Sequence, residues 1–64
     1  MFLTALQVNV HSSKHFIQES ASGMYYGKDG LFTMRRYDAR LFKNKHFAEY
    51  EIERIELRFF ASKT

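Results

Sequence analysis

The stretch Gly27–Gly30, which reads Gly-Lys-Asp-Gly, most constrains how this chain can fold. An Asp-Gly pair tolerates the positive φ angles that tight hairpin turns require. Short runs rich in aromatic residues flank it, Met24–Tyr26 before the turn and Leu31–Thr33 after it. The pattern predicts a hairpin of two short strands, and therefore an antiparallel sheet.

Two further strands are predicted before the hairpin. Polar and apolar residues alternate over Leu6–Val10, which is typical of a half-buried strand, whereas Phe2–Leu6 is less regular and is also compatible with a helix. His15–Ser20 is predicted as a second strand. It places Phe16 and Ile17 on opposite faces, so one of them must pack outside the main core or at an edge.

A helix is predicted after the sheet, over about 45–55. Asn44 stands where a helix N-cap is expected, because its side-chain oxygen can accept a hydrogen bond from a free helical N–H. Strand is the competing assignment, since Tyr50 and Ile52 alternate with charged residues, but the cap and the Ala/Glu content favour helix. Ile55–Phe59 fits either a closing strand or a continuation of the helix. The expected inner residues are Ala48, Ile52 and Ile55 with Phe47 beside them, and Glu49, Glu53 and Glu56 are expected outside.

Together with a short strand at Ala39–Phe42, these elements predict an α+β fold. It consists of a small antiparallel sheet of four or five short strands with one helix packed on one face, in a single domain over 1–64. The chain has 64 residues and no cysteine, so no disulfide can supplement its core. Seven Phe and four Tyr compensate, because each ring can bury roughly 150–250 Å².

The hairpin and the segment after it resemble a class of very short phage and prophage accessory proteins. The matching residues are Gly23–Thr33, which read Gly-Met-Tyr-Tyr, turn, Gly-Leu-Phe-Thr, and then Asp38–Phe42, which lead into an Ala/Glu-rich helix. The resemblance covers about half of the chain, and the chain before Lys14 lies outside it. It implies a small accessory protein of a virus or mobile element with no catalytic residues to transfer. Some such proteins bind and block a host protein, including defence nucleases.

The charge of the chain is unevenly placed, although its formal net value is only +3. Lys28–Lys45 holds six basic residues and two acidic ones, whereas His46–Arg58 holds four Glu and two Arg. Such a field steers partners without defining them. The first residues lack a basic segment followed by a long apolar run, so neither a signal peptide nor a membrane partner is expected. The expected location is the cytoplasm, that of the host if the protein is phage-encoded.

No arrangement of residues predicts an enzyme, a cofactor or a metal site. His11 and His15 are spaced i, i+4, but their strand-like flanks argue against the helix that would bring two imidazoles together. Ser12 and Ser13 lack the strained Gly-x-Ser-x-Gly turn of a nucleophile. Gly27–Gly30 lacks the spacing of a phosphate-binding loop. A chain this short also has little material with which to enclose a substrate.

Two kinds of binding surface are compatible with the middle of the chain. Eleven aromatic rings cannot all be enclosed in so small a domain, and exposed Tyr, Phe and Arg are enriched at protein interfaces. The rings expected to be exposed are Tyr25, Tyr26, Tyr37 and Phe60. Binding of a host protein, with inhibition as its outcome, is the first hypothesis, and its site residues are Tyr25, Tyr26, Arg35, Arg36 and Tyr37.

The alternative is single-stranded nucleic acid, which needs cations for phosphates and rings for stacking. Its site residues are Arg35, Arg36, Arg40, Lys43 and Lys45. The surplus rings and open strand edges would also allow a homodimer.

Overall fold

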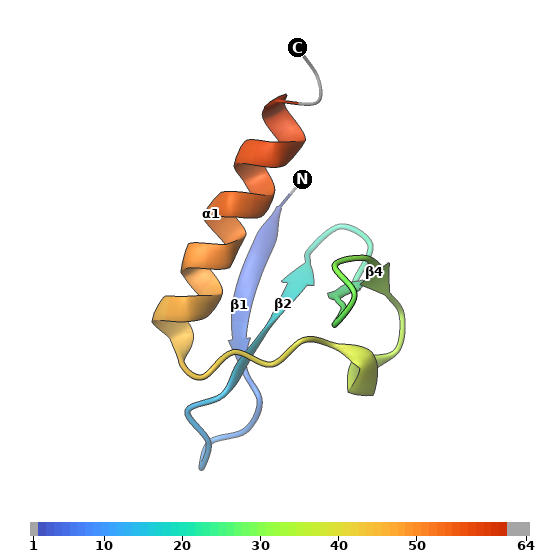
Figure 1. The fold of residues 1–64 in the computed structure, drawn as a ribbon. Helices are drawn as coiled ribbons and strands as arrows, with labels where there is room; N and C mark the ends of the chain where they lie inside the picture. The colour runs from blue at the N-terminus through green and yellow to red at the C-terminus, as the bar shows by residue number, and fades with distance from the viewer. Residues whose placement is uncertain (1, 62–64) are drawn as a thin grey trace.

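The computed structural model, which describes residues 2–61, is a four-stranded antiparallel sheet with one helix along one face (Figure 1). The strands follow one another in the order β1-β2-β3-β4, so the sheet is a simple meander. A single 3₁₀ turn, η1, links the last strand to the segment that leads into α1. The elements are β1 (Leu3–Gln7), β2 (His15–Glu19), β3 (Tyr25–Tyr26), β4 (Phe32–Thr33), η1 (Arg36–Asp38) and α1 (Lys45–Ala61). The predicted α+β fold is confirmed.

The register of the sheet decides which side chains meet the helix. Ala5 lies opposite Ile17, and Tyr26 lies opposite Phe32. Neighbouring residues of a strand point to opposite faces, so Phe16 and Ile17 lie on opposite sides of the sheet, as the sequence predicts. Ile17 is the one that faces the helix. Ile17 is fully buried and belongs to the main core, which also contains Leu3, Tyr26, Phe42, Ala48 and Ile55.

The hairpin between β3 and β4 forms as predicted. The N–H of Gly27 donates to the carbonyl oxygen of Leu31 at 2.8 Å, and Gly30 has a φ of +84°. A Cβ on Gly27 would lie only 2.6 Å from that oxygen, so a larger residue would force the turn apart. Both glycines of the turn are therefore required by its geometry.

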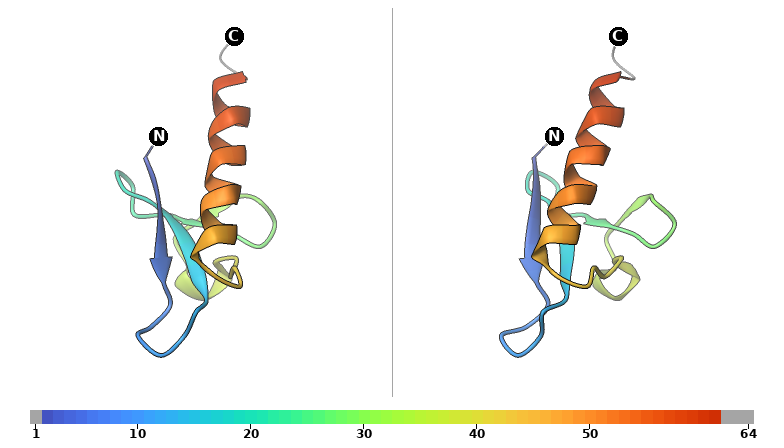
Figure 2. Two further views of the ribbon diagram at one scale, coloured as in Figure 1. Left: turned by 90° about the vertical axis from the view of Figure 1, so that its left-hand side faces the viewer. Right: turned by 60° about the vertical axis from the view of Figure 1, so that its left-hand side comes forward.

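The helix begins where it is predicted to begin but ends later. The side-chain Oδ1 of Asn44 accepts a hydrogen bond from the N–H of Phe47 at 3.1 Å, which is the expected N-cap. Of the two alternatives for Ile55–Phe59, helix continuation is correct and the closing strand is wrong, so α1 runs past the predicted 45–55 to Ala61. No Gly or Pro follows Ile55 to stop it. Its last turns rise past the sheet (Figure 2).

Two strand predictions are wrong in detail. β1 begins at Leu3, so the helical alternative for Phe2–Leu6 does not hold, and the strand ends at Gln7 rather than at Val10. Five consecutive pairs with β2 fix this position. The expected strand at Ala39–Phe42 is reduced to two isolated bridges, His15 with Phe42 and Gly27 with Ala39. Ala39 therefore pairs with Gly27, next to β3, whereas Phe42 pairs with β2, and no continuous ladder forms.

Candidate protein-binding surface

The segment around η1 presents two of the five predicted protein-binding residues to solvent. Tyr37 is 75% exposed, and Arg35 is also exposed. Their backbone is held by local hydrogen bonds: Arg35 N–H donates to Thr33 Oγ1 at 3.1 Å, and Asp38 N–H donates to the carbonyl oxygen of Arg35 at 3.1 Å. The exposed ring and cation thus stand on a short, internally bonded turn.

Tyr25 and Arg36 have a different role, because they cover Phe16 on the side of the sheet that faces away from α1. The ring of Tyr25 meets that of Phe16 edge to face, with centroids 5.5 Å apart. The guanidinium of Arg36 lies 3.8 Å from the centroid of the Phe16 ring. Ring pairs and cation–π contacts of this kind each contribute about 0.5–2 kcal/mol. Phe16 is therefore buried outside the main core, and the two residues above it are only partly exposed.

The prediction that Tyr26 is exposed is wrong. The residue is only 5% exposed, and its hydroxyl donates a hydrogen bond to Glu51 Oε2 at 3.0 Å. The same carboxylate oxygen lies 3.6 Å from Arg40 Nη1 and 3.9 Å from Arg58 Nη2. Tyr26 thus joins β3 to the middle of α1, and its replacement would alter the core rather than a surface.

Glu51 is the residue that sequence reasoning missed. A glutamate in a predicted helix is normally solvated, yet Glu51 is only 9% exposed. The available signal was its spacing. It follows Ala48 by three residues and precedes Ile55 by four, so it lies on the buried side of the helix.

Three apolar side chains that were not predicted as site residues lie on the same segment as Arg35 and Tyr37. Leu31 and Met34 are each 68% exposed, and Leu41 is 46% exposed. Exposed apolar and aromatic side chains beside a cation have the composition of a protein-binding site. We call this set the connector surface: Leu31, Met34, Arg35, Tyr37 and Leu41.

The basic residues of the segment fall into two groups. The guanidinium of Arg36 packs on the ring of Phe16. The guanidinium of Arg40 contacts both Glu51 and the face of Phe42, whose ring centroid is 5.2 Å away. Within residues 2–61, by contrast, no ion pair involves the remaining three: Arg35, Lys43 and Lys45.

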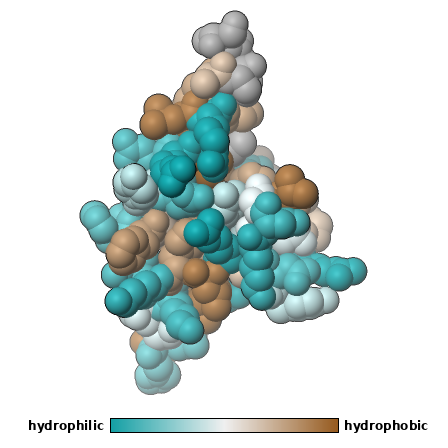
Figure 3. Space-filling view, viewed as in Figure 1, coloured by the Kyte–Doolittle hydropathy of each residue, from teal (hydrophilic) through white to brown (hydrophobic). Residues whose placement is uncertain are grey.

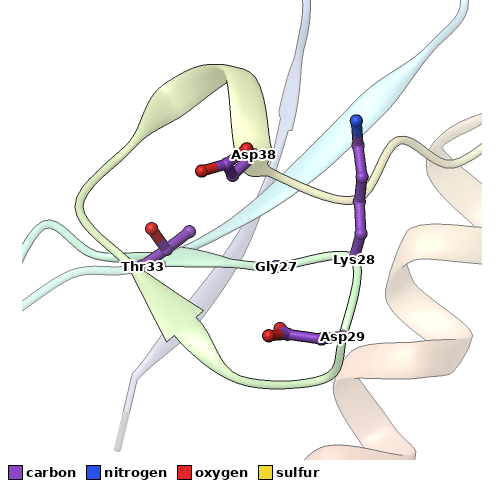
Figure 4. Close-up of a pocket in the computed structure, with 5 residues that line it drawn as sticks. All are labelled: Gly27, Lys28, Asp29, Thr33 and Asp38. Carbon is purple, nitrogen blue, oxygen red and sulfur yellow. The ribbon is translucent and has the colours of Figure 1, made fainter.

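A hollow of about 320 Å³ lies inside the loop closed by the hairpin and η1 (Figure 4). The residues that line it are Gly27, Lys28, Asp29, Thr33 and Asp38. The Oδ1 of Asp29 accepts a hydrogen bond from the N–H of Leu31 at 3.0 Å, which ties that carboxylate to the turn. The hollow is open to solvent, and its shape is set by the backbone of the β3–β4 turn.

A second exposed apolar surface runs along α1. Tyr50 is 60% exposed and Leu57 is 62% exposed, and Phe60 is exposed as predicted. Phe47, which was expected beside the core, is 51% exposed, so that prediction is wrong. Hydrophobic surface is visible at both the lower and the upper part of the helix edge, with hydrophilic surface between (Figure 3). We call this set the outer stripe: Phe47, Tyr50, Leu57 and Phe60.

The histidine and serine residues weighed as chemical groups lie in and around the β1–β2 connection. His15 Nδ1 is 2.7 Å from the carbonyl oxygen of Ser13, and the hydroxyl of Ser13 donates to the carbonyl oxygen of Lys43 at 3.1 Å. Among the described residues, no three His, Cys, Asp or Glu side chains are grouped as metal ligands would be. The His15 ring and the Ser13 hydroxyl thus each contact a backbone carbonyl oxygen.

Comparison with protein-family models, with curated proteins and with solved structures gives no significant match to this chain. Within the part that the structure describes, no helix is long and apolar enough to cross a bilayer.

Proposed function

We propose that this protein is a stoichiometric protein-binding module that occupies a surface on another protein through the connector surface. One observation carries the proposal: four large apolar side chains within the eleven residues from Leu31 to Leu41 are exposed, although the domain has a small core. Single exposed apolar residues are ordinary, but several in one short segment that also carries an exposed cation, Arg35, have the composition of an interface. The resemblance to phage accessory proteins extends the proposal to a host or defence protein that is inhibited by occlusion.

The chemistry of the surface indicates what kind of partner it fits. Five basic residues and one acidic residue lie between Met34 and Lys45. A partner should therefore present acidic side chains around an apolar depression that accepts Tyr37 or Met34. No catalytic group is needed, because an inhibitor of this kind acts by covering a site.

The test uses two tagged double variants in parallel with the wild-type chain. R35E/Y37A changes the connector surface, and V10A/K14E makes comparable changes at exposed residues of the β1–β2 connection, where Val10 is 83% exposed. Each protein is used to capture partners from host lysate with and without nuclease, and circular dichroism verifies that each is folded. We expect a nuclease-resistant protein, captured in a one-to-one ratio, that is lost with R35E/Y37A and retained with V10A/K14E. Equal capture by both variants would refute the assignment of the surface.

Single-stranded nucleic acid is the second candidate, because Arg35, Lys43 and Lys45 are exposed and have no ion pair within residues 2–61. The rings available for stacking are fewer than expected, since Tyr26 and Phe42 are buried and Tyr25 is partly covered. This function predicts that affinity for a labelled oligonucleotide falls steeply with salt, as neutralised phosphates release counterions. Fluorescence anisotropy at two salt concentrations distinguishes the two functions, and capture that disappears with nuclease would favour this one.

A further inference from the structure

Helix α1 carries two apolar stripes, and the sheet covers only one of them. Each residue turns an α-helix by about 100°, so residues seven apart share a line along it. Ala48 and Ile55 form one such line and are buried against the sheet. Tyr50 and Leu57 form another, about 200° away, and both are exposed. The core of this domain therefore does not account for the apolar residues of the outer stripe.

The charges beside the outer stripe are divided by sign. Glu49 and Glu53 lie on one side of the line through Tyr50 and Leu57, and Arg54 and Arg58 lie on the other. Each pair is spaced i, i+4, so each side brings like charges together, which is unfavourable in an isolated helix. Within residues 2–61, Glu53 and Arg54 form no ion pair. A surface that offers basic groups to the glutamate side and acidic groups to the arginine side would relieve the repulsion between Glu49 and Glu53, and it would give Arg54 a partner beside the contact that Arg58 already makes with Glu51.

A second copy of the same helix offers that surface in one orientation. When two helices pair in parallel about a two-fold axis, the left side of one faces the right side of the other. Glu53 of each copy then meets Arg54 of the other. In an antiparallel pair centred on these residues, Arg54 would face Arg54 and Glu53 would face Glu53. The sheet does not obstruct the parallel pair, because it lies on the opposite side of α1 (Figure 2).

We propose that α1 is the dimerisation element of this protein, and that two copies pair in parallel through the outer stripe. A helix of 17 residues is about 25 Å long. A single pair of such helices buries less than the roughly 1,200–2,000 Å² of stable complexes. The dimer is therefore reversible and depends on concentration. It leaves the connector surface free, so it is independent of the proposed binding function.

Charge exchange tests the pairing. Sedimentation equilibrium on the wild-type chain over a range from micromolar to near-millimolar concentrations should show a monomer–dimer equilibrium. E53R and R54E should each shift the dissociation constant at least tenfold toward monomer, because each puts like charges against like. An equimolar mixture of the two variants should associate again as a heterodimer, since each then offers what the other lacks. Both positions are exposed, and unchanged helical circular dichroism verifies that the fold is retained.

Three outcomes would overturn the proposal. The first is a wild-type chain that is monomeric at every concentration. The second is a dimer that E53R and R54E leave unchanged, as expected if the open edge of β1 were the contact. The third is a mixture that fails to associate although each variant is weakened.

The orientation is tested with H46C, because the chain has no native cysteine. In the parallel pair the two introduced thiols lie near each other at one end of the helices. In an antiparallel pair they would be about 22 Å apart along the axis, far beyond the reach of a disulfide. Oxidation under conditions where the protein is dimeric should give a covalent dimer. A dimer that does not cross-link would overturn the parallel arrangement.

Discussion

The inner and outer faces of α1 carry similar apolar patterns and meet opposite surroundings. On the inner face, Ala48 is fully buried and Ile55 is 6% exposed, whereas on the outer face Tyr50 and Leu57 are each at least 60% exposed. The difference shows that apolar spacing alone does not identify the core side of a short helix. In this helix the core side is decided by the small side chain of Ala48, which lets the helix approach the sheet closely, and by the hydrogen bond between Glu51 and Tyr26.

The sharpest test of this comparison is truncation on each face. Ile55→Ala should destabilise the fold by about 2–5 kcal/mol, because it leaves a cavity between helix and sheet. Leu57→Ala should change the free energy of unfolding by less than about 0.5 kcal/mol. Urea unfolding at dilute, monomeric concentration measures both.

A domain of this size has roughly 3–5 kcal/mol of stability, so Ile55→Ala can unfold it outright. Ile55→Val, with an expected cost of about 0.5–1.5 kcal/mol, gives the graded measurement. Equal effects at positions 55 and 57 would show that the two faces are not distinct.

A second, smaller contrast compares two tyrosines. Tyr26→Phe should cost about 0.5–1.5 kcal/mol, because it removes the hydrogen bond to a buried carboxylate. Tyr50→Phe is the matched control, and no measurable change is expected because its hydroxyl is exposed. Combining Tyr26→Phe with Glu51→Gln in a double-mutant cycle gives the coupling energy. A coupling near zero would contradict a structural role for this contact.

Glu19 extends the comparison between buried and exposed positions, because its carboxylate lies at the surface and nonetheless contributes to the stability of the fold. The backbone N–H of Ala21, together with the hydroxyl and N–H of Ser22, stabilises the carboxylate and lowers its pKa from 4.5 to about 2. As the pH falls, the Glu19 carboxylate is therefore protonated at a higher pH in the unfolded chain than in the folded chain. The contribution of Glu19 to stability is present above pH 4.5 and is lost as the pH falls through about 2.

Glu19→Gln should consequently flatten the decline in stability between pH 5 and pH 2. Thermal unfolding across that range measures the slopes. A Glu19→Gln variant that declines as steeply as the wild-type chain would refute the role of the Glu19 carboxylate. We expect the smallest of the three effects here, because solvent screens the charge.

Much of the fold could be predicted because it follows from local chemistry. The Asp-Gly turn, the Asn44 cap and the opposite faces of Phe16 and Ile17 each depend on neighbouring residues, and each is confirmed. The end of the helix could not be predicted, because residues after Ile55 fit helix and strand equally well. The bridges at Ala39 and Phe42 depend on partners 12 and 27 residues away in the chain.

The candidate site was predicted less well, for a related reason. Tyr37 was correctly expected to be exposed, and Arg35, which was predicted as a site residue, is exposed as well. Tyr26 and Arg36 are residues of the same two types, yet Tyr26 is buried and Arg36 packs against Phe16. Whether a tyrosine in a two-residue strand points inward depends on register, and register is set by pairing between strands.

The sequence by itself determined where the chain turns, where its helix begins and that its class is α+β, because caps, glycines and alternation act within a few residues. Only the tertiary structure decided which rings are enclosed, that Glu51 is buried beside Tyr26, and which face of α1 remains open. Those choices depend on how far separated segments pack, and a one-residue shift in a strand or a rotation of the helix would reverse them.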